Sequence, residues 1–157
     1  MLSAIASGEP SEGALHRDAL AAYDAMQRQD VVLYGDSLGG PYAAYLATRR
    51  KARCVVIENS FPSLAALGNE VYRPLPLGWT APRALATARW LNEAGLPVLV
   101  MHSRADNVIP FRLGQRLYDE LRTPKKMLVS QTAEHGGIPY TEGARYYDAV
   151  TAFVRRH

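Results

Sequence analysis

The chain has 157 residues, a formal net charge of +3 and 48% hydrophobic residues. This length suits one globular domain with a single core, and the small, scattered positive charge does not indicate a nucleic-acid partner. Cys54 is the only cysteine, which excludes an intrachain disulfide and a multi-cysteine metal site. No apolar run is long enough to span a membrane, and the apolar segment at residues 2–6 is too short for a secretion signal. We therefore predict a cytoplasmic protein with no membrane partner.

The spacing of apolar residues predicts helices and strands in alternation. A helix is expected to begin at Ser11–Gly13 and to end before Asp30. Strands are predicted at 31–35, 54–58, 96–102 and 126–130, and helices at 38–50, 82–94, 110–121 and from about 139 onward. Residues 65–82 contain a proline- and glycine-rich stretch, which predicts a small, irregular, cap-like excursion. The whole pattern predicts one α/β domain over residues 1–157, with a mostly parallel sheet and helices on both faces.

The segment Gly35-Asp36-Ser37-Leu38-Gly39-Gly40 lies between a predicted strand and a predicted helix. A serine at the tip of so sharp a turn takes strained backbone angles, and its neighbours two positions away must be small so that strand and helix can pass closely. Gly35 and Gly39 meet that demand. The start of the helix also directs free N–H groups to the same place. The spacing therefore predicts Ser37 as a nucleophile with an oxyanion donor beside it.

Two later loops carry the partners that a nucleophilic serine needs. Asp106 follows the third predicted strand and His135 follows the fourth. Because parallel strands end at one edge of a sheet, both side chains should lie near Ser37. The chemistry requires a base that takes the serine proton and a carboxylate that fixes the tautomer of that base, so we assign these roles to His135 and Asp106. Glu58 is the alternative acid, and His102 is predicted to be a packed core histidine.

These motifs resemble those of the α/β-hydrolase superfamily, and the segments that carry the likeness are Gly35–Gly40, Pro97–His102 with Asp106 and Pro110, and Glu134–Gly136. The likeness is greatest to the compact branch related to prolyl-oligopeptidase catalytic domains and bacterial esterases, and it extends from the helix near Gly13 to the last helix. The resemblance implies that Ser37 is the nucleophile, Asp106 the acid, His135 the base and the Leu38 N–H an oxyanion donor. We expect no cofactor and no bound metal.

The resemblance implies a serine esterase that cleaves small acyl esters through an acyl-enzyme. The same groups could also cleave thioesters or short peptides. Phe61, Trp79 and Ile138 are the expected substrate-binding residues, in an open pocket below a short cap. A small-molecule ester is the expected partner.

Members of this superfamily carry several strands and a helix before the segment that corresponds to Ser7–Pro10, and a loop there supplies a second oxyanion donor. The chain looks like the C-terminal two thirds of such an enzyme. The strand at 31–35 would then form a sheet edge, and Val31, Val32 and Leu33 would expose apolar surface. We therefore expect a homodimer or larger homo-oligomer. A catalytically silent hydrolase that acts as a dimerising or binding module is the alternative function.

Overall fold

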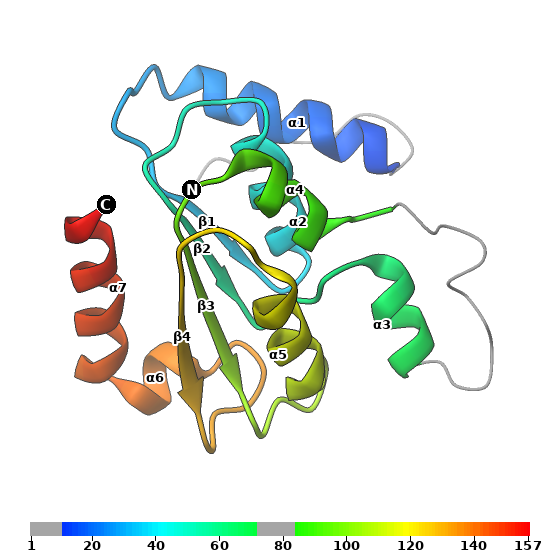
Figure 1. Cartoon of the computed structure of the whole chain (residues 1–157), viewed down its shortest axis with the longest axis vertical. Coiled ribbons are helices and arrows are strands. Elements are labelled where there is room, and N and C mark those ends of the chain that lie inside the picture. The colour runs from blue at the N-terminus through cyan, green and yellow to red at the C-terminus, as the bar shows by residue number, and fades with distance from the viewer. Residues whose placement is uncertain (1–10, 72–83) are drawn as a thin grey trace.

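A computed structural model of the chain describes residues 11–71 and 84–157 (Figure 1). The strands are β1 (Leu33–Asp36), β2 (Val55–Glu58), β3 (Val98–Ser103) and β4 (Lys125–Ser130). The helices are α1 (Glu12–Ala25), α2 (Gly39–Ala47), α3 (Leu64–Val71), α4 (Thr87–Ala94), α5 (Phe111–Glu120), α6 (Ile138–Glu142) and α7 (Ala144–Arg156). The strands form one parallel sheet in the order β1-β2-β3-β4, and helical crossovers join them, as parallel pairing requires. This arrangement confirms the predicted fold class.

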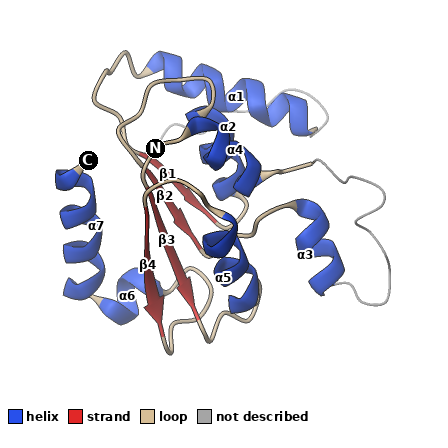
Figure 2. Cartoon of the chain, in the orientation of Figure 1, coloured by secondary structure: helices blue, strands red, loops and turns tan. Residues whose placement is uncertain are grey.

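Helices cover both faces of the sheet, as Figures 1 and 2 show. One set of alternating strand residues, with Leu33, Ile57 and Val100 among them, packs against α2, α4 and α5. The other set, which includes Val56 and Met101, packs against α7. Strands buried on both faces need continuous apolar runs, which is the pattern that the sequence shows. All the strands end at the edge that carries the loops after β1, β3 and β4.

Two helical segments differ from the sequence-based expectation. Helix α3 occupies the beginning of the region predicted to be irregular, and the Ser63 hydroxyl caps it by accepting a hydrogen bond of 3.1 Å from the Ala66 N–H. The last predicted helix is divided into α6 and α7, because the backbone turns at Gly143, which has a positive φ of 50°. The remainder of the expected cap, including Trp79, lies outside the described residues.

The edge strand β1 exposes less apolar side-chain surface than the sequence predicted. Val31 and Leu33 are only 8% and 5% exposed, because helices that pack on this face of the sheet cover them. Val32 is half-buried against the α7 side of the sheet. The expectation that all three side chains are exposed is therefore wrong. The exposed large hydrophobic side chain of this strand is Tyr34, at 47%, and Asp36 is the other exposed residue.

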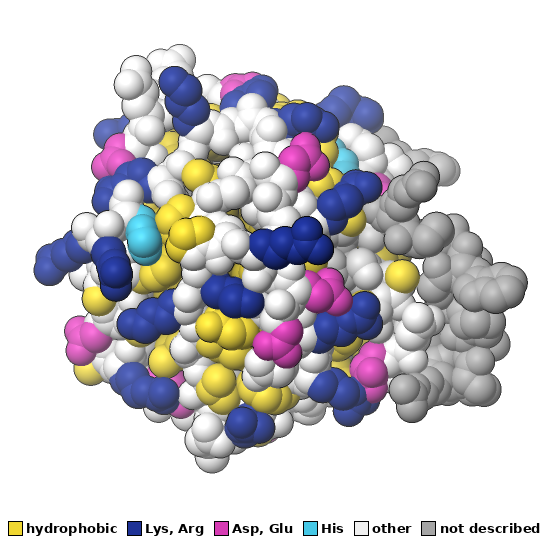
Figure 3. Space-filling model, viewed as in Figure 1, with side chains coloured by type: hydrophobic (Ala, Val, Ile, Leu, Met, Phe, Trp, Pro, Cys, Tyr) yellow, Lys and Arg dark blue, Asp and Glu magenta, His cyan; other side chains and the backbone are white. Residues whose placement is uncertain are grey.

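The visible surface carries charges of both signs. Figure 3 shows lysine and arginine side chains spread over this face with aspartate and glutamate between them. Among the described helices, none combines the length and the apolar character that crossing a bilayer requires.

Candidate active site

Ser37 lies at the turn between the end of β1 and the start of α2. Its φ is +53°, a left-handed value that is unfavourable for a residue with a side chain. The surrounding backbone holds this conformation, because the Ser37 N–H donates to the Glu58 carbonyl at 2.9 Å and the Gly40 N–H donates to the Ser37 carbonyl at 3.1 Å. A strained residue held by its neighbours is what a nucleophile elbow requires.

Two glycines of this segment provide the close approach of strand and helix. A Cβ on Gly35 would lie 2.5 Å from the Gly39 carbonyl oxygen, and a Cβ on Gly40 would lie 2.3 Å from the Ser60 hydroxyl. A Cβ on Gly39 would meet nothing within 4 Å. The assignment of Gly39 to this steric role is therefore wrong. Gly40 has the role instead, because α2 passes over the chain that leaves β2.

His135, in the loop after β4, contacts both other members of the expected triad. Its Nε2 lies 3.0 Å from the Ser37 Oγ, and its Nδ1 lies 2.8 Å from Oδ2 and 3.0 Å from Oδ1 of Asp106. A carboxylate accepts hydrogen bonds, so this contact places the proton on Nδ1 and leaves the Nε2 lone pair toward the serine hydroxyl. The structure therefore brings the three residues together in the order that proton transfer from Ser37 needs.

The loop that contains Asp106 holds its carboxylate in place. Oδ1 accepts hydrogen bonds from the N–H groups of Val108 at 2.9 Å and Ile109 at 2.8 Å. The Asp106 side chain has no exposed surface, whereas that of His135 is 20% exposed. Backbone donors stabilise the ionised carboxylate and fix its orientation. The reactive edge of the imidazole thus remains accessible while its carboxylate partner is buried.

The alternative acid, Glu58, has other partners. Its Oε2 accepts hydrogen bonds from the Tyr34 hydroxyl and, at 3.2 Å, from the Tyr146 hydroxyl. Burial raises the pKa of this carboxyl group. The carboxylate that contacts His135 belongs to Asp106 instead.

Leu38 is the residue between Ser37 and the first residue of α2. Within residues 11–71 and 84–157, its backbone N–H has no hydrogen-bond partner, and its side chain is 51% exposed. The first N–H groups of a helix lack intrahelical acceptors. The Leu38 N–H is therefore available to an oxygen that approaches Ser37.

Two of the expected substrate-binding residues, Phe61 and Ile138, are not at an accessible surface. Phe61 is 1% exposed in a cluster with Ile109 and Leu113, and Ile138 is fully buried beside the α7 side of the sheet. Both therefore pack in the core, and the expectation that they contact substrate is not supported. Trp79 lies outside the described residues.

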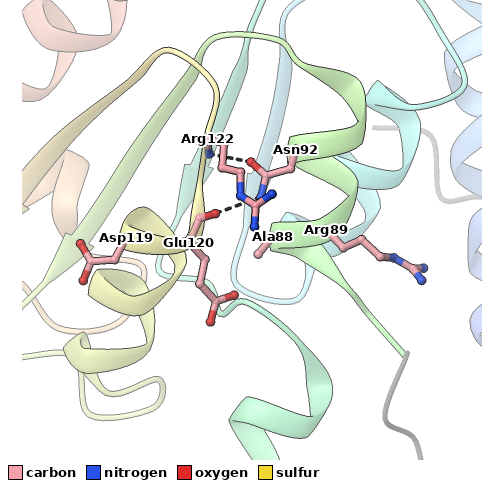
Figure 4. A pocket seen from close by; sticks show the side chains of 6 residues that line it. All are labelled: Ala88, Arg89, Asn92, Asp119, Glu120 and Arg122. Atoms are coloured by element: carbon pink, nitrogen blue, oxygen red, sulfur yellow. Dashed lines mark hydrogen bonds between the residues drawn. The ribbon is translucent and has the colours of Figure 1, made fainter.

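A pocket of about 600 Å³ lies between α4 and the end of α5, and Figure 4 shows its lining. The Asn92 side chain joins the two walls, because its Nδ2 donates to the Glu120 carbonyl at 2.9 Å and its Oδ1 accepts from the Arg122 N–H at 2.7 Å. These residues precede β3 and β4, whereas Ser37, Asp106 and His135 follow strands. The pocket is therefore at the opposite edge of the sheet from the candidate triad.

A parallel sheet with a serine at a strained strand-to-helix turn, and with an acid and a histidine after later strands, defines an α/β hydrolase. Residues 14–157 match the prolyl oligopeptidase family, and the chain belongs to that family.

The chain is also similar to curated proteins and to solved structures. The chain is 29% identical over 153 residues to the uncharacterized protein Rv2307c of Mycobacterium tuberculosis, covering 94% of this chain and 54% of that protein. It is 29% identical over 161 residues to the lysophosphatidylserine lipase ABHD12 of Danio rerio, covering 88% and 41%. The chain thus spans about half the length of the curated relatives that it matches. The esterase domain of a Rhodothermus marinus protein has the same fold, with a TM-score of 0.70, 19% identity and coverage of 90% and 68%.

Proposed function

We propose that the chain is a serine hydrolase that cleaves small carboxylic esters through a triad of Ser37, His135 and Asp106. The observation that carries the proposal is the continuous contact from the Ser37 Oγ through His135 to the buried Asp106 carboxylate. Each residue lies at the same sheet edge but comes from a different loop. A fully buried carboxylate bonded to a partly exposed imidazole is suited to proton transfer at an adjacent hydroxyl.

The first half of the reaction forms an acyl-enzyme. The Nε2 of His135 takes the Ser37 proton as the Oγ attacks the ester carbonyl, and the resulting oxyanion receives a hydrogen bond from the Leu38 N–H. Asp106 stabilises the imidazolium that forms. The tetrahedral intermediate then collapses, the bond to the alcohol oxygen breaks, and His135 returns the proton to the departing alcohol.

The second half reverses these proton movements with water as the nucleophile. His135 takes a proton from water as the water oxygen attacks the acyl carbonyl, and it then protonates the Ser37 Oγ as the carboxylic acid leaves. The enzyme returns to its starting state, so the sum of both halves is hydrolysis of one ester bond.

Ester substrates are favoured by the activities after which two similar proteins are named. One of these proteins is described as a lipase of lysophosphatidylserine and the other as an esterase domain. Peptide hydrolysis remains the alternative because the family is that of prolyl oligopeptidase. The triad chemistry is common to both reactions, so the leaving group and the substrate-binding surface decide between them.

A fluorophosphonate probe and a substrate panel test the proposal. The panel contains p-nitrophenyl acetate, butyrate and octanoate together with an aminoacyl anilide. We expect the probe to label the wild-type chain but not Ser37→Ala, and the esters to be turned over faster than the anilide. Labelling with preferential anilide turnover would support a peptidase. The absence of both Ser37-dependent labelling and turnover would reject the hydrolase and support the silent binding module.

The identity of the acid requires a separate comparison. Asp106→Asn leaves a side chain of nearly the same shape but cannot hold His135 in the required tautomer, so we expect kcat to fall by about 10³–10⁴-fold. Glu58→Gln is the matched control, because it removes the other buried carboxylate of this sheet edge. If Glu58→Gln lost activity and Asp106→Asn kept it, the acid assignment would be reversed.

A further inference from the structure

A second histidine lies behind the acid of the triad. His102 is on β3, its side chain is completely buried, and its Nε2 lies 3.4 Å from the Oδ2 of Asp106. The same Nε2 lies 2.9 Å from the Ile109 carbonyl oxygen. The sequence-based prediction of a packed core histidine is confirmed by this burial. The sequence did not predict the contact with Asp106.

The Ile109 peptide connects these two side chains. Its N–H donates to the Oδ1 of Asp106 at 2.8 Å, while its carbonyl faces His102. Because a carbonyl oxygen only accepts hydrogen bonds, the His102 Nε2 must carry the proton. His102, Ile109 and Asp106 therefore form a closed set of contacts, and the Oδ2 that His102 approaches is also the oxygen that lies 2.8 Å from the His135 Nδ1.

The opposite side of the His102 ring is closed by α5. Its Nδ1 has no hydrogen-bond partner among the described residues, and a Cβ on Gly114 would lie only 2.0 Å from it. Burial lowers the pKa of His102, because the charged imidazolium would lose its hydration there. The ring is thus held as a neutral imidazole with a single N–H, directed at Ile109 and Asp106.

We propose that His102 is a positioning residue for Asp106, which it holds through the Ile109 peptide and by direct contact with Oδ2. This inference rests on the proposed function of Asp106 as the acid of the triad. A buried, unpartnered imidazole nitrogen costs stability, and an apolar side chain in this space would avoid that cost. The contribution of His102 is its Nε2–H, because this donor fixes the loop whose N–H groups orient the Asp106 carboxylate.

Three variants separate this role from simple packing. His102→Leu fills the space without a donor, whereas His102→Gln keeps an amide N–H that can reach the Ile109 carbonyl. Gly114→Ala leaves His102 in the sequence but forces its ring to move. Val100→Ala is the control for a loss of core stability, because Val100 is on the same strand and packs against the helices without contacting Asp106.

We expect His102→Leu and Gly114→Ala to lower kcat by about 10- to 100-fold with a smaller change in KM, because a small displacement of a catalytic group has that effect. We expect His102→Gln to restore most of the loss, and Val100→Ala to lower the melting temperature without this change in kcat. If His102→Leu and Gly114→Ala kept the wild-type kcat, or if Val100→Ala reduced it equally, the positioning role would be rejected.

An NMR measurement tests the same role without any turnover. In the ¹⁵N-labelled wild-type chain, we expect His102 to be neutral with its proton on Nε2, and the His135 Nδ1 proton to be protected from exchange by Asp106. His102→Gln should keep this protection, whereas His102→Leu, or Gly114→Ala if the leucine variant does not fold, should lose it. A proton on the His102 Nδ1, or full protection in His102→Leu and Gly114→Ala, would overturn the inference. A wild-type chain with the expected signals but no Ser37-dependent activity would instead reject the proposed function alone.

Discussion

The hydroxyl of Tyr146, on α7, lies 3.2 Å from the carboxylate of Glu58, which ends β2. The Tyr34 hydroxyl donates to the same carboxylate oxygen and lies 3.0 Å from the hydroxyl of Tyr146. Glu58 is only 1% exposed, and burial raises its pKa, with a smaller contribution from the nearby Asp36. These three side chains join α7 to β1 and β2 next to the nucleophile. Their carboxyl group, that of Glu58, is in a place where its negative charge is unfavourable.

The raised pKa of Glu58 makes the stability of the fold depend on pH. The folded chain binds this proton more tightly than the unfolded chain, so the stabilisation is complete below the unfolded pKa of about 4.3 and is lost as the pH rises through the folded pKa. We therefore expect the melting temperature of the wild type, relative to that of Glu58→Gln, to fall as the pH is raised from the acid range to neutrality. Tyr146→Phe keeps the carboxyl group and should keep the pH dependence. A difference between wild type and Glu58→Gln that stayed constant or grew with pH would contradict this prediction.

The sequence predicted those parts of the site that have a local signature. The strand before Ser37 and the small residues around it indicate the elbow without any knowledge of the rest of the chain, and the positions of Asp106 and His135 after later strands follow from parallel topology. Long-range packing carries no such signature. The Tyr146 hydroxyl contacts Glu58 across 88 residues of sequence. Neither a tyrosine nor a glutamate at these positions indicates in the sequence that the two side chains are in contact.

The expected substrate-binding residues also show how far the sequence alone can predict packing. Phe61 and Ile138 follow strands at the correct edge of the sheet, but an apolar residue in that position either lines a pocket or fills the core. The choice depends on which helix covers it, and here α5 and α7 belong to the clusters that bury them. Helix α3 differs from the expectation for a related reason. The proline- and glycine-rich residues that follow it in the sequence favour irregular structure, whereas Ser63 caps the start of the helix.

Asp36 is an exposed carboxylate beside the nucleophile, and its neutralisation should weaken catalysis. Partial burial raises its pKa, and the nearby His135 opposes this shift. Asp36→Asn removes a negative charge that stabilises the imidazolium of the transition state, so we expect kcat/KM to fall by about 3- to 10-fold. Asp119→Asn, at the opposite edge of the sheet, is the control and should leave kcat/KM unchanged. A kcat/KM that did not fall in Asp36→Asn, or that fell equally in Asp119→Asn, would count against this role.

Leu38→Pro removes the Leu38 N–H. Proline fits the φ of −63° at Leu38 itself, but its ring disfavours the left-handed φ of +53° at the preceding Ser37. The variant therefore loses the expected oxyanion donor and also displaces the nucleophile, and we expect kcat to fall by more than the roughly 10²–10³-fold that loss of one donor costs. Leu38→Ala shortens the side chain but keeps the N–H, so it should stay near wild type. Equal losses in both variants would instead assign the effect to the leucine side chain.

We propose that two copies pair through β1, which is the terminal strand of the sheet in the described residues. The N–H groups of Leu33 and Ser37 donate to the carbonyls of Cys54, just before β2, and Glu58, at its end. In this parallel pair, the N–H of the intervening Tyr34 therefore faces the open edge. An edge strand paired with its own copy about a two-fold axis satisfies these groups in both subunits.

Tyr34→Pro tests this contact, because it removes the outward N–H without removing a donor to β2. A charge at Val32 would be a poorer test, since the structure packs that side chain against the core. Tyr34→Phe is the matched control, because it loses the same hydroxyl contact with Glu58 but keeps the backbone donor. Light scattering should report a dimer or larger assembly for the wild type and Tyr34→Phe, and a monomer for Tyr34→Pro. If the wild-type chain were a well-folded monomer at micromolar concentration, or if the proline variant assembled normally, the β1 interface would be rejected.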